Sequence, residues 1–178
     1  AMAFGADPAF AKGRARGGDK ALLGLLDAIF NDGIARSPEF ATILGLDKGN
    51  LGHLRSKLTP PTAAERRSDL TRTRGWLRQL NAIPAASLGA PAKRYQALVR
   101  YMLEQRSLSA GRFDIDSVQF PYRINQQGGA YFGTPDFLDS SHPIETAADC
   151  NAYLARLSAF AVQLDQDSAS QRAEAARG

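Results

Sequence analysis

Cysteine, histidine and tryptophan are scarce in this 178-residue chain, and their scarcity excludes several classes of protein. There is one cysteine, Cys150, so no disulfide can form within the chain. Cys150, His53 and His142 are the three cysteine and histidine side chains of the sequence, whereas a structural zinc site normally takes four such ligands. No stretch approaches the roughly 20 consecutive apolar residues that cross a bilayer, so we expect no membrane span. One cysteine leaves the cellular compartment undecided.

The familiar catalytic motifs are also missing from the sequence. There is no HExxH, no GxSxG, no P-loop and no GxGxxG, and no spacing links serine, histidine and aspartate into a triad. Asp114 and Asp116 lie on the same side of an extended segment and could form a carboxylate pair, although such a pair is more often exposed and merely polar. The sequence therefore supplies no catalytic set and leaves open whether the protein is an enzyme.

The chain carries a net positive charge that is unevenly distributed along the sequence. The net charge is +4, residues 55–100 carry +8, and residues 113–178 carry −5. Such asymmetry can attract an acidic partner, or the two halves can pack on each other. Arg67, Arg74 and Arg78 fall on one side of a helical wheel and are candidates for anion binding. The alternative is a solvated face or ion pairs to the acidic half.

Hydrophobic periodicity predicts an all-α fold, a bundle-like array of several helices. Residues 1–18 are interpreted as a flexible leader, and residues 19–178 as a single helical domain. We expect helices over 19–36, from Pro38 to a stop at Gly45, over 62–83, from near Pro91, and from a cap at Thr146. The last helix is expected to bury Cys150, Tyr153, Leu154, Leu157, Phe160 and Leu164.

One segment, residues 113–133, has no helical period and is expected to be irregular or to form a short β-hairpin. Pro135 is expected to begin the short helix that follows. Amides beside paired glycines and aromatic residues suit a loop that approaches a ligand closely. The candidate ligand-binding residues are Asn125, Gln126, Gln127 and Tyr131. The alternative is that the segment plugs a helical bundle.

Residues 39–58 follow the pattern of a helix-turn-helix, and a small DNA-binding protein is therefore one alternative function. That function requires a continuous recognition helix through Asn50–Leu58. Gly49 and Gly52 would together cost that helix about 2 kcal/mol. We therefore expect a loop over Lys48–Gly52, and nucleic acid is not the expected partner.

Several short phrases follow one another along the chain in a fixed order. A "SPxxATxLG" phrase is matched by Ser37, Pro38, Ala41, Thr42 and Gly45. An arginine-rich helix, the stretch "FDIDSVQFPYRINQQGG" and a "hPi" phrase follow in order. A "DaxxYlxRL" helix is then matched by Asp149, Tyr153, Arg156 and Leu157. In this order the phrases resemble the bacterial family called domain of unknown function 885, and the resemblance covers about residues 20–178.

The resemblance implies a longer, largely helical protein, exported or lipid-anchored, whose C-terminal part is similar to zinc metallopeptidases. None of the implied zinc ligands lies in these 178 residues, so no catalytic residue or metal site carries over. The resemblance thus favours an N-terminal fragment, a non-catalytic scaffold of a hydrolase of uncharacterised substrate. Its expected partners are the remainder of its own polypeptide and a peptide substrate of the intact protein. A stand-alone helical binding module is a second alternative.

Overall fold

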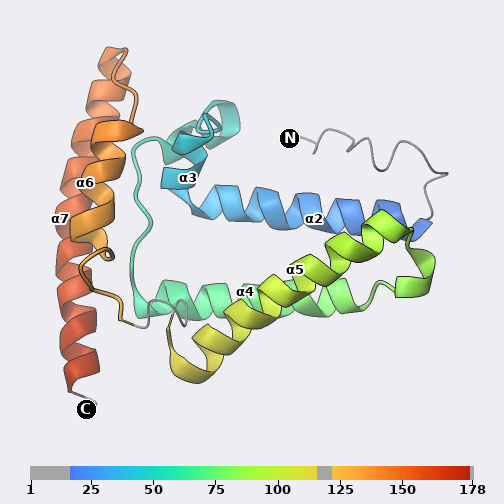
Figure 1. Ribbon diagram of the computed structural model, residues 1–178. Coiled ribbons are helices and arrows are strands. Elements are labelled where there is room, and N and C mark those ends of the chain that lie inside the picture. Colours follow the sequence, from blue (N-terminus) through green and yellow to red (C-terminus); the bar gives the residue numbers. More distant parts are fainter. Residues whose placement is uncertain (1–16, 116–121, 177–178) are drawn as a thin grey trace. The chain divides into compact units, whose positions relative to one another are not determined.

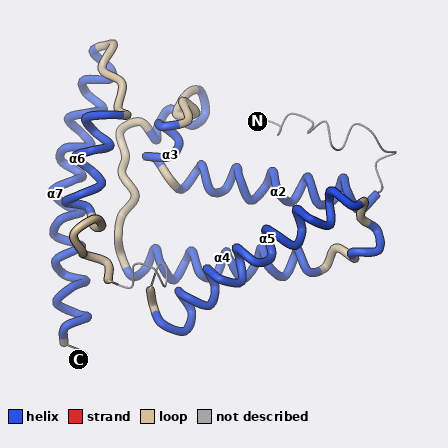
Figure 2. Tube along the Cα trace, in the orientation of Figure 1, coloured by secondary structure: helices blue, strands red, loops and turns tan. Residues whose placement is uncertain are grey.

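The computed structural model describes residues 17–115 and 122–176, and every regular element within them is helical (Figure 1, Figure 2). The predicted all-α fold is therefore confirmed. The elements are α2 (Gly17–Arg36), α3 (Pro38–Ile43), the 3-10 helix η1 (Gly49–Leu54), α4 (Ala63–Asn81), the 3-10 helix η2 (Ala85–Ser87), α5 (Ala90–Leu108), the π-helical turn η3 (Ser109–Phe113), α6 (Ala130–Ser140) and α7 (Ala147–Ala175). None of these helices is long and apolar enough to cross a membrane.

The chain divides into two compact units, each built from two stretches of sequence. Among the described residues, unit 1 contains 17–32 and 68–115, and unit 2 contains 33–67 and 122–176. The single domain predicted for residues 19–178 stays a prediction. Gly17 and Gly18, assigned to the predicted leader, begin α2, while the rest of that leader lies outside the described residues.

Unit 1 has a small apolar core to which α2, α4 and α5 all contribute, and α5 crosses α4 obliquely in Figure 1. Leu22, Leu80, Leu88 and Ala92 are completely buried. The side chains packed around them recur at helical spacing, and they are Leu25, Leu26, Ile83, Tyr95, Val99 and Leu103. The apolar spacing of the three helices accounts for most of these residues, but not for Leu88, which lies between η2 and α5, or for Ala92. On α5 the same apolar pattern extends to Leu98 and Met102, which are exposed.

Two buried polar side chains form hydrogen bonds with backbone groups at helix ends in unit 1. The Asp19 carboxylate accepts a hydrogen bond from the Gly89 amide (2.8 Å), which is the N-cap of α5. The Gln96 amide donates to the carbonyls of Leu80 (3.1 Å) and Ile83 (2.8 Å) at the end of α4. Both contacts satisfy backbone groups that a helix terminus leaves without partners.

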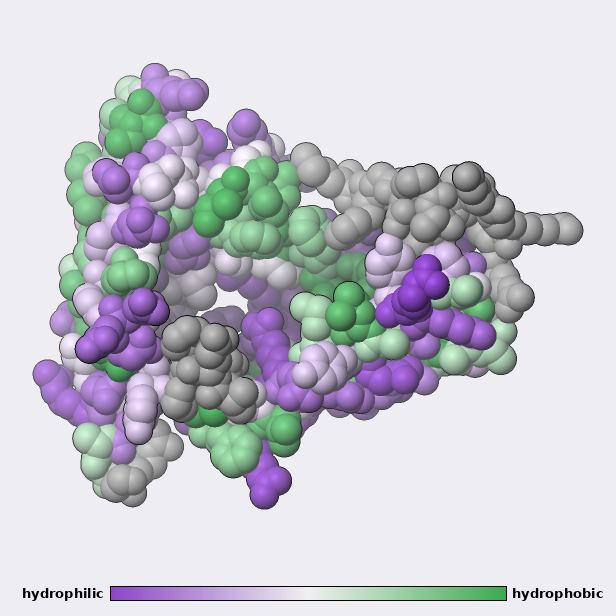
Figure 3. Space-filling view, in the orientation of Figure 1, coloured by the Kyte–Doolittle hydropathy of each residue, from purple (hydrophilic) through white to green (hydrophobic). Residues whose placement is uncertain are grey.

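Unit 2 begins with a short helix that ends in a tight turn. Ser37 and Pro38 start α3 as predicted, and Gly45 adopts a left-handed φ of 66°. The Gly45 amide bonds to the Thr42 carbonyl (2.9 Å) and the Leu46 amide to the Ala41 carbonyl (2.8 Å), a Schellman motif. Phe40 and Ile43 on α3 and Leu44 directly after it are exposed. Figure 3 shows apolar surface in the region of α3.

The long helix α7 packs along α6 in unit 2. Leu58, Phe137 and Leu138 form the apolar core here, with Tyr153, Ala159 and Phe160 against them. The predicted cap of α7 at Thr146 is confirmed, and it is a full capping box: Asp149 and Thr146 exchange side-chain-to-backbone hydrogen bonds.

The predicted buried face of α7 is wrong in part. Tyr153, Phe160 and Leu164 are partly buried, but Cys150, Leu154 and Leu157 are exposed. The buried residues of α7 are mostly polar instead: Asp149, Ala152, Arg156, Gln163 and Asp167. A search for apolar periodicity cannot find a polar inner face, and this is the physical reason for the error.

Two local predictions also need correction, and a third is confirmed in part. Pro135 lies inside α6, which begins at Ala130, because the Asp167 carboxylate accepts the Ala130 amide (2.7 Å) and fixes an earlier start. Residues 49–54 form η1 rather than a loop, and no continuous helix runs through residues 50–58, so the helix-turn-helix geometry is missing. The segment 113–133 is predicted to be irregular or a short hairpin, and residues 122–129 are irregular, with a single Asn125–Gly128 bridge and no hairpin strands. Residues 116–121 lie outside the described residues.

Candidate functional site

The inner face of α7 carries a regular series of mostly polar side chains. Its residues alternate in spacings of four and three, and they are Asp149, Tyr153, Arg156, Phe160, Gln163 and Asp167. This heptad spacing keeps all of them on one side of the helix. Arg156 is 0% exposed and Asp149 is 3% exposed. Because burying charged groups is unfavourable unless they are bonded, the partners of these two residues define the site.

Arg156 on α7 is completely buried, and each of its three guanidinium nitrogens donates a hydrogen bond. Its Nε bonds to the Lys57 carbonyl (2.9 Å), Nη1 to His142 Nδ1 (2.6 Å) and Nη2 to Thr42 Oγ1 (2.7 Å). Nη2 also lies 3.3 Å and 3.4 Å from the carbonyl oxygens of Leu54 and Pro38. The guanidinium stands 4.8 Å from the centroid of the Phe137 ring. Burial lowers the pKa of Arg156 and outweighs the attraction of the nearby Glu39 and Asp47 carboxylates. All of its hydrogen-bond acceptors are neutral groups.

The bond from Arg156 fixes the state of His142, which is buried. A guanidinium can only donate, so Nδ1 of His142 must accept and carries no proton. Nε2 then carries the proton and donates to the Asp149 carbonyl at 3.1 Å. The imidazole also meets the Tyr153 ring edge-on, with centroids 5.5 Å apart. All the polar capacity of His142 is thus used inside the protein.

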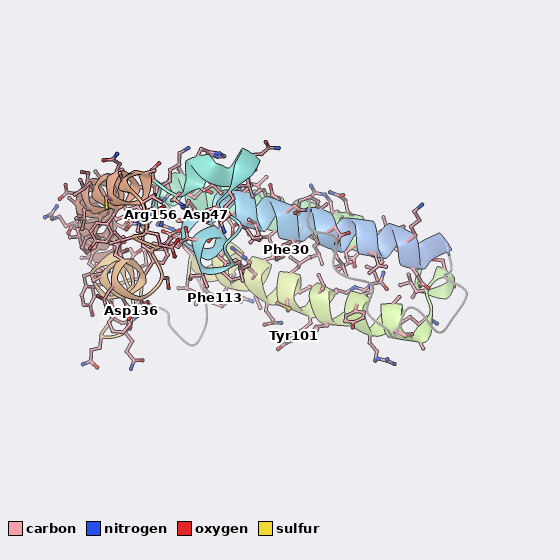
Figure 4. The ribbon with its side chains drawn as sticks, turned by 90° about the horizontal axis from the view of Figure 1, so that it is seen from above. Phe30, Asp47, Tyr101, Phe113, Asp136 and Arg156 are labelled. Atoms are coloured by element: carbon pink, nitrogen blue, oxygen red, sulfur yellow. The ribbon has the colours of Figure 1, made fainter. Side chains whose placement is uncertain are left out.

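A second arginine joins two buried carboxylates. Arg55 donates through Nε to Asp47 Oδ2 (3.1 Å) and through Nη1 to Asp149 Oδ1 (2.6 Å). The Thr42 hydroxyl lies 2.9 Å from Asp47 Oδ2 and donates to it, which connects Asp47 to Arg156. Figure 4 shows Asp47 and Arg156 beside each other.

These contacts form a closed loop of hydrogen bonds, which we call the polar ring. It runs through Asp149, Arg55, Asp47, Thr42, Arg156 and His142, and returns to the Asp149 carbonyl. The ring joins α3, the turn after it, the residue that follows η1, the loop before α7 and α7 itself. Such fully bonded networks specify one arrangement of the elements that they connect.

The electrostatics of the polar ring keep both of its carboxylates ionised. Burial alone would raise the pKa of Asp47, but hydrogen bonds from Arg55 and Thr42 outweigh burial and hold the pKa below its usual value. Hydrogen bonds from Thr146, with a further one from Arg55, lower the pKa of Asp149. The pKa of Arg55 is raised, chiefly by its hydrogen bond to Asp47.

The described residues do not offer a donor set that fits zinc. No three His, Cys, Asp or Glu side chains among them are grouped to hold a metal ion. His142 is buried and bonded to Arg156, whereas Cys150 and His53 are exposed. The polar ring likewise pairs no nucleophile with a free base. The hydrogen bonds of the polar ring hold structural elements together.

The predicted ligand-binding residues come together where the turn before α6 meets the start of that helix, which contains Tyr131. The Asn125 side chain accepts from the Gln127 amide (2.9 Å) and donates to the Tyr122 carbonyl (3.0 Å). The Tyr131 hydroxyl donates to the Asn125 carbonyl at 2.5 Å, and Gln126 is exposed beside them. The polar groups of Asn125 and Tyr131 therefore hold the turn itself. Ligand binding here stays a prediction.

The predicted anion-binding arginines all lie on α4 with exposed side chains. Arg67 belongs to unit 2, while Arg74 and Arg78 belong to unit 1. Of the carboxylate pair suggested by the sequence, Asp114 is exposed and Asp116 lies outside the described residues. Anion binding by the arginines stays a prediction.

The polar ring was not found from the sequence, although several of its residues lie in phrases singled out there. Thr42 belongs to "SPxxATxLG", His142 to "hPi", and Asp149 and Arg156 to "DaxxYlxRL". A polar residue repeated every seven positions, at 149, 156 and 163, was the available signal for a polar inner face. No sequence pattern indicated that Asp47 and Arg55 would belong to the ring.

Comparison with known proteins places these phrases in one family. Residues 38–178 match a family described as "Bacterial protein of unknown function (DUF885)". Neither a curated protein nor a solved structure matches the chain. The matched residues include the whole polar ring and more than half of the sequence. The chain therefore belongs to this bacterial family.

Proposed function

We propose that residues 38–178 form a non-catalytic helical scaffold that supports the catalytic part of a longer, metallopeptidase-like hydrolase. The proposed partner is the remainder of its own polypeptide. A zinc ion, a peptide substrate and an extracytoplasmic location belong to this proposal for the intact protein and rest on the family resemblance.

The observation that carries the proposal is that α7 leaves leucine side chains exposed while most of its fully buried residues are polar. Its buried side holds Asp149, Arg156, Gln163 and Asp167, while Leu154 is 59% exposed and Leu157 is 40% exposed. A surface helix in water normally shows the opposite arrangement. Apolar side chains gathered on an exposed face mark an interaction surface. The polarity of α7 thus supports packing against further protein.

The polar ring supports the same proposal from the inside. Its donors and acceptors satisfy each other and hold α3 and η1 on α7. A scaffold needs such a fixed arrangement of elements, whereas a catalytic site needs polar groups that remain free to meet a substrate.

Calorimetric titration of the whole chain with zinc, combined with a peptide-hydrolysis assay, tests the non-catalytic part of the proposal. We expect no stoichiometric zinc binding and no hydrolysis with or without added zinc. Stoichiometric binding, or turnover that a chelator removes, would refute the scaffold role.

The apolar face of α7 can be tested with the dye anilinonaphthalene sulfonate, which binds exposed apolar surface. The double variant Leu154→Ser, Leu157→Ser is expected to bind less dye than the unaltered chain at equal helix content. Ser158→Ala, on the same helix, is the matched control and should leave dye binding unchanged. Equal dye binding by all three proteins would contradict the proposed interaction surface.

A further inference from the structure

A groove in unit 1 lies where α4 meets the C-terminal end of α5. Its volume is about 390 Å³, and it lies open to solvent, because most of its lining residues are exposed. The lining residues are Arg74, Leu77, Glu104, Ser107, Leu108, Gly111 and Arg112. The groove is separate from the polar ring, which belongs to unit 2.

The backbone that forms one wall of this groove has an unusual conformation. Helix α5 continues into the π-helical turn η3, and the Ile115 amide closes that turn on the Ser109 carbonyl at 3.3 Å. Asp114 follows with a left-handed φ of 53°, and no other described residue except glycine has a positive φ. Single π-helical turns and left-handed non-glycine residues occur preferentially at binding sites.

Two guanidinium groups line the groove. Arg74 lies directly against the backbone of Gly111, where an added Cβ would stand 2.5 Å from Arg74 Nη2. Gly111 therefore makes room for Arg74. The Arg112 guanidinium stacks over the Phe113 ring, 5.4 Å from its centroid. Within residues 17–115 and 122–176, neither arginine has an ion-pair partner.

The remaining lining of the groove is partly apolar and partly polar. Leu77 and Leu108 supply apolar surface, and Ser107 supplies a hydroxyl. Glu104 is the acidic residue of the lining, so the two arginines leave a net charge of +1. A single negative charge on the ligand would neutralise the site, whereas a second would meet Glu104.

We propose that this groove binds a small organic monoanion with an apolar body, such as a medium-chain carboxylate. Arg74 and Arg112 hold the carboxylate through charge-assisted hydrogen bonds. Leu77 and Leu108 cover the apolar body. This activity goes beyond the scaffold role and does not depend on it. Of the three arginines that the sequence suggested, Arg74 lines the groove.

The proposal is tested by titrating the whole chain with octanoate in a calorimeter. Trp76, next to Leu77 in the chain, provides an independent fluorescence signal. Octanol supplies the apolar body without charge, and acetate supplies the charge without the apolar body. We expect saturable binding of octanoate at one site, and binding at least about tenfold weaker for octanol and acetate.

Variants separate a specific site from general attraction to a basic surface. Arg74→Gln and Arg112→Gln are each expected to weaken octanoate binding about tenfold or more. Arg78→Gln, on the same helix but outside the lining, is the matched control and should bind as the unaltered chain does. Glu104→Gln should tighten the binding of suberate, a dianion. Circular dichroism checks that every variant folds.

Three outcomes would overturn the proposal. The first is the absence of saturable octanoate binding, and the second is octanol binding as tightly as octanoate. The third is an equal loss of octanoate binding in Arg78→Gln and in both Arg74→Gln and Arg112→Gln, which would mean attraction to net charge alone.

Discussion

Replacing Arg156 by methionine tests the polar ring at its centre. Methionine retains much of the length and apolar stem of arginine but removes every donor. His142 Nδ1 then loses the hydrogen bond at 2.6 Å, and Thr42 Oγ1 loses the one at 2.7 Å. The Lys57 carbonyl loses its bond as well. Since Arg156 is completely buried, water cannot replace these donors without rearrangement.

The expected loss of stability follows from these contacts. Each buried polar group left without a partner costs about 1–3 kcal/mol, and the contact with the Phe137 ring contributes about 1 kcal/mol. Removing the desolvation penalty of the guanidinium offsets part of that sum, so we expect a net loss of about 3 kcal/mol. Natural domains have stabilities of only about 5–15 kcal/mol, so this loss is large.

Urea unfolding followed by circular dichroism measures this loss as a shift of the midpoint at constant slope. Arg172→Met, on the exposed side of the same helix, is the control and should change stability by less than about 0.5 kcal/mol. In a double-mutant cycle with Thr42→Val, we expect a coupling of more than about 0.5 kcal/mol. If Arg156→Met is as stable as the control, the polar ring does not hold unit 2 together.

Three further predictions concern pH and unit 1. Folding lowers the pKa of both carboxylates in the polar ring, so in acid the folded state binds fewer protons than the unfolded chain. The free energy of unfolding should therefore be constant near neutrality and fall as the pH drops below about 4, as measured by urea titrations. Leu22→Ala should lose about 2–5 kcal/mol in the same assay, because Leu22 is completely buried, whereas the exposed Ala28→Ser should have little effect. Gly18→Ala should lower the thermal midpoint, since its Cβ would lie 2.6 Å from the Ser87 carbonyl oxygen, whereas Gly24→Ala meets open space and should raise the midpoint. An increase in both midpoints would contradict the close approach of Gly18 to Ser87.

The sequence predicts the helices of this protein well, because their signals are local. Apolar spacing locates α2, α4 and α5, and Thr146 with Asp149 locates the start of α7. The start of α6 could not be predicted, because the Asp167 carboxylate that fixes it lies 37 residues away in the sequence. Pro135 is a strong local signal, but this long-range contact overrides it.

The polar ring could not be predicted for a related reason. Burial is normally inferred from apolar character, and Arg156 and Asp149 are charged. Their burial depends on partners such as Thr42 and Arg55, which are separated from them by 114 and 94 residues. The family resemblance marked some of these positions without indicating that they touch. Sequence patterns thus identified the elements of unit 2 but not the contacts that join them.

The wide sequence separation within the polar ring has a consequence for folding kinetics. Contacts between residues about 100 positions apart close large loops, and the entropy of loop closure slows their formation. Residues 68–115, which belong to unit 1, lie in the chain between the two halves of unit 2. Ordering of that insert shortens the effective loop before the ring closes. We therefore expect the ring to form after the folding transition state, so that Arg156→Met accelerates unfolding and leaves the rate of folding nearly unchanged.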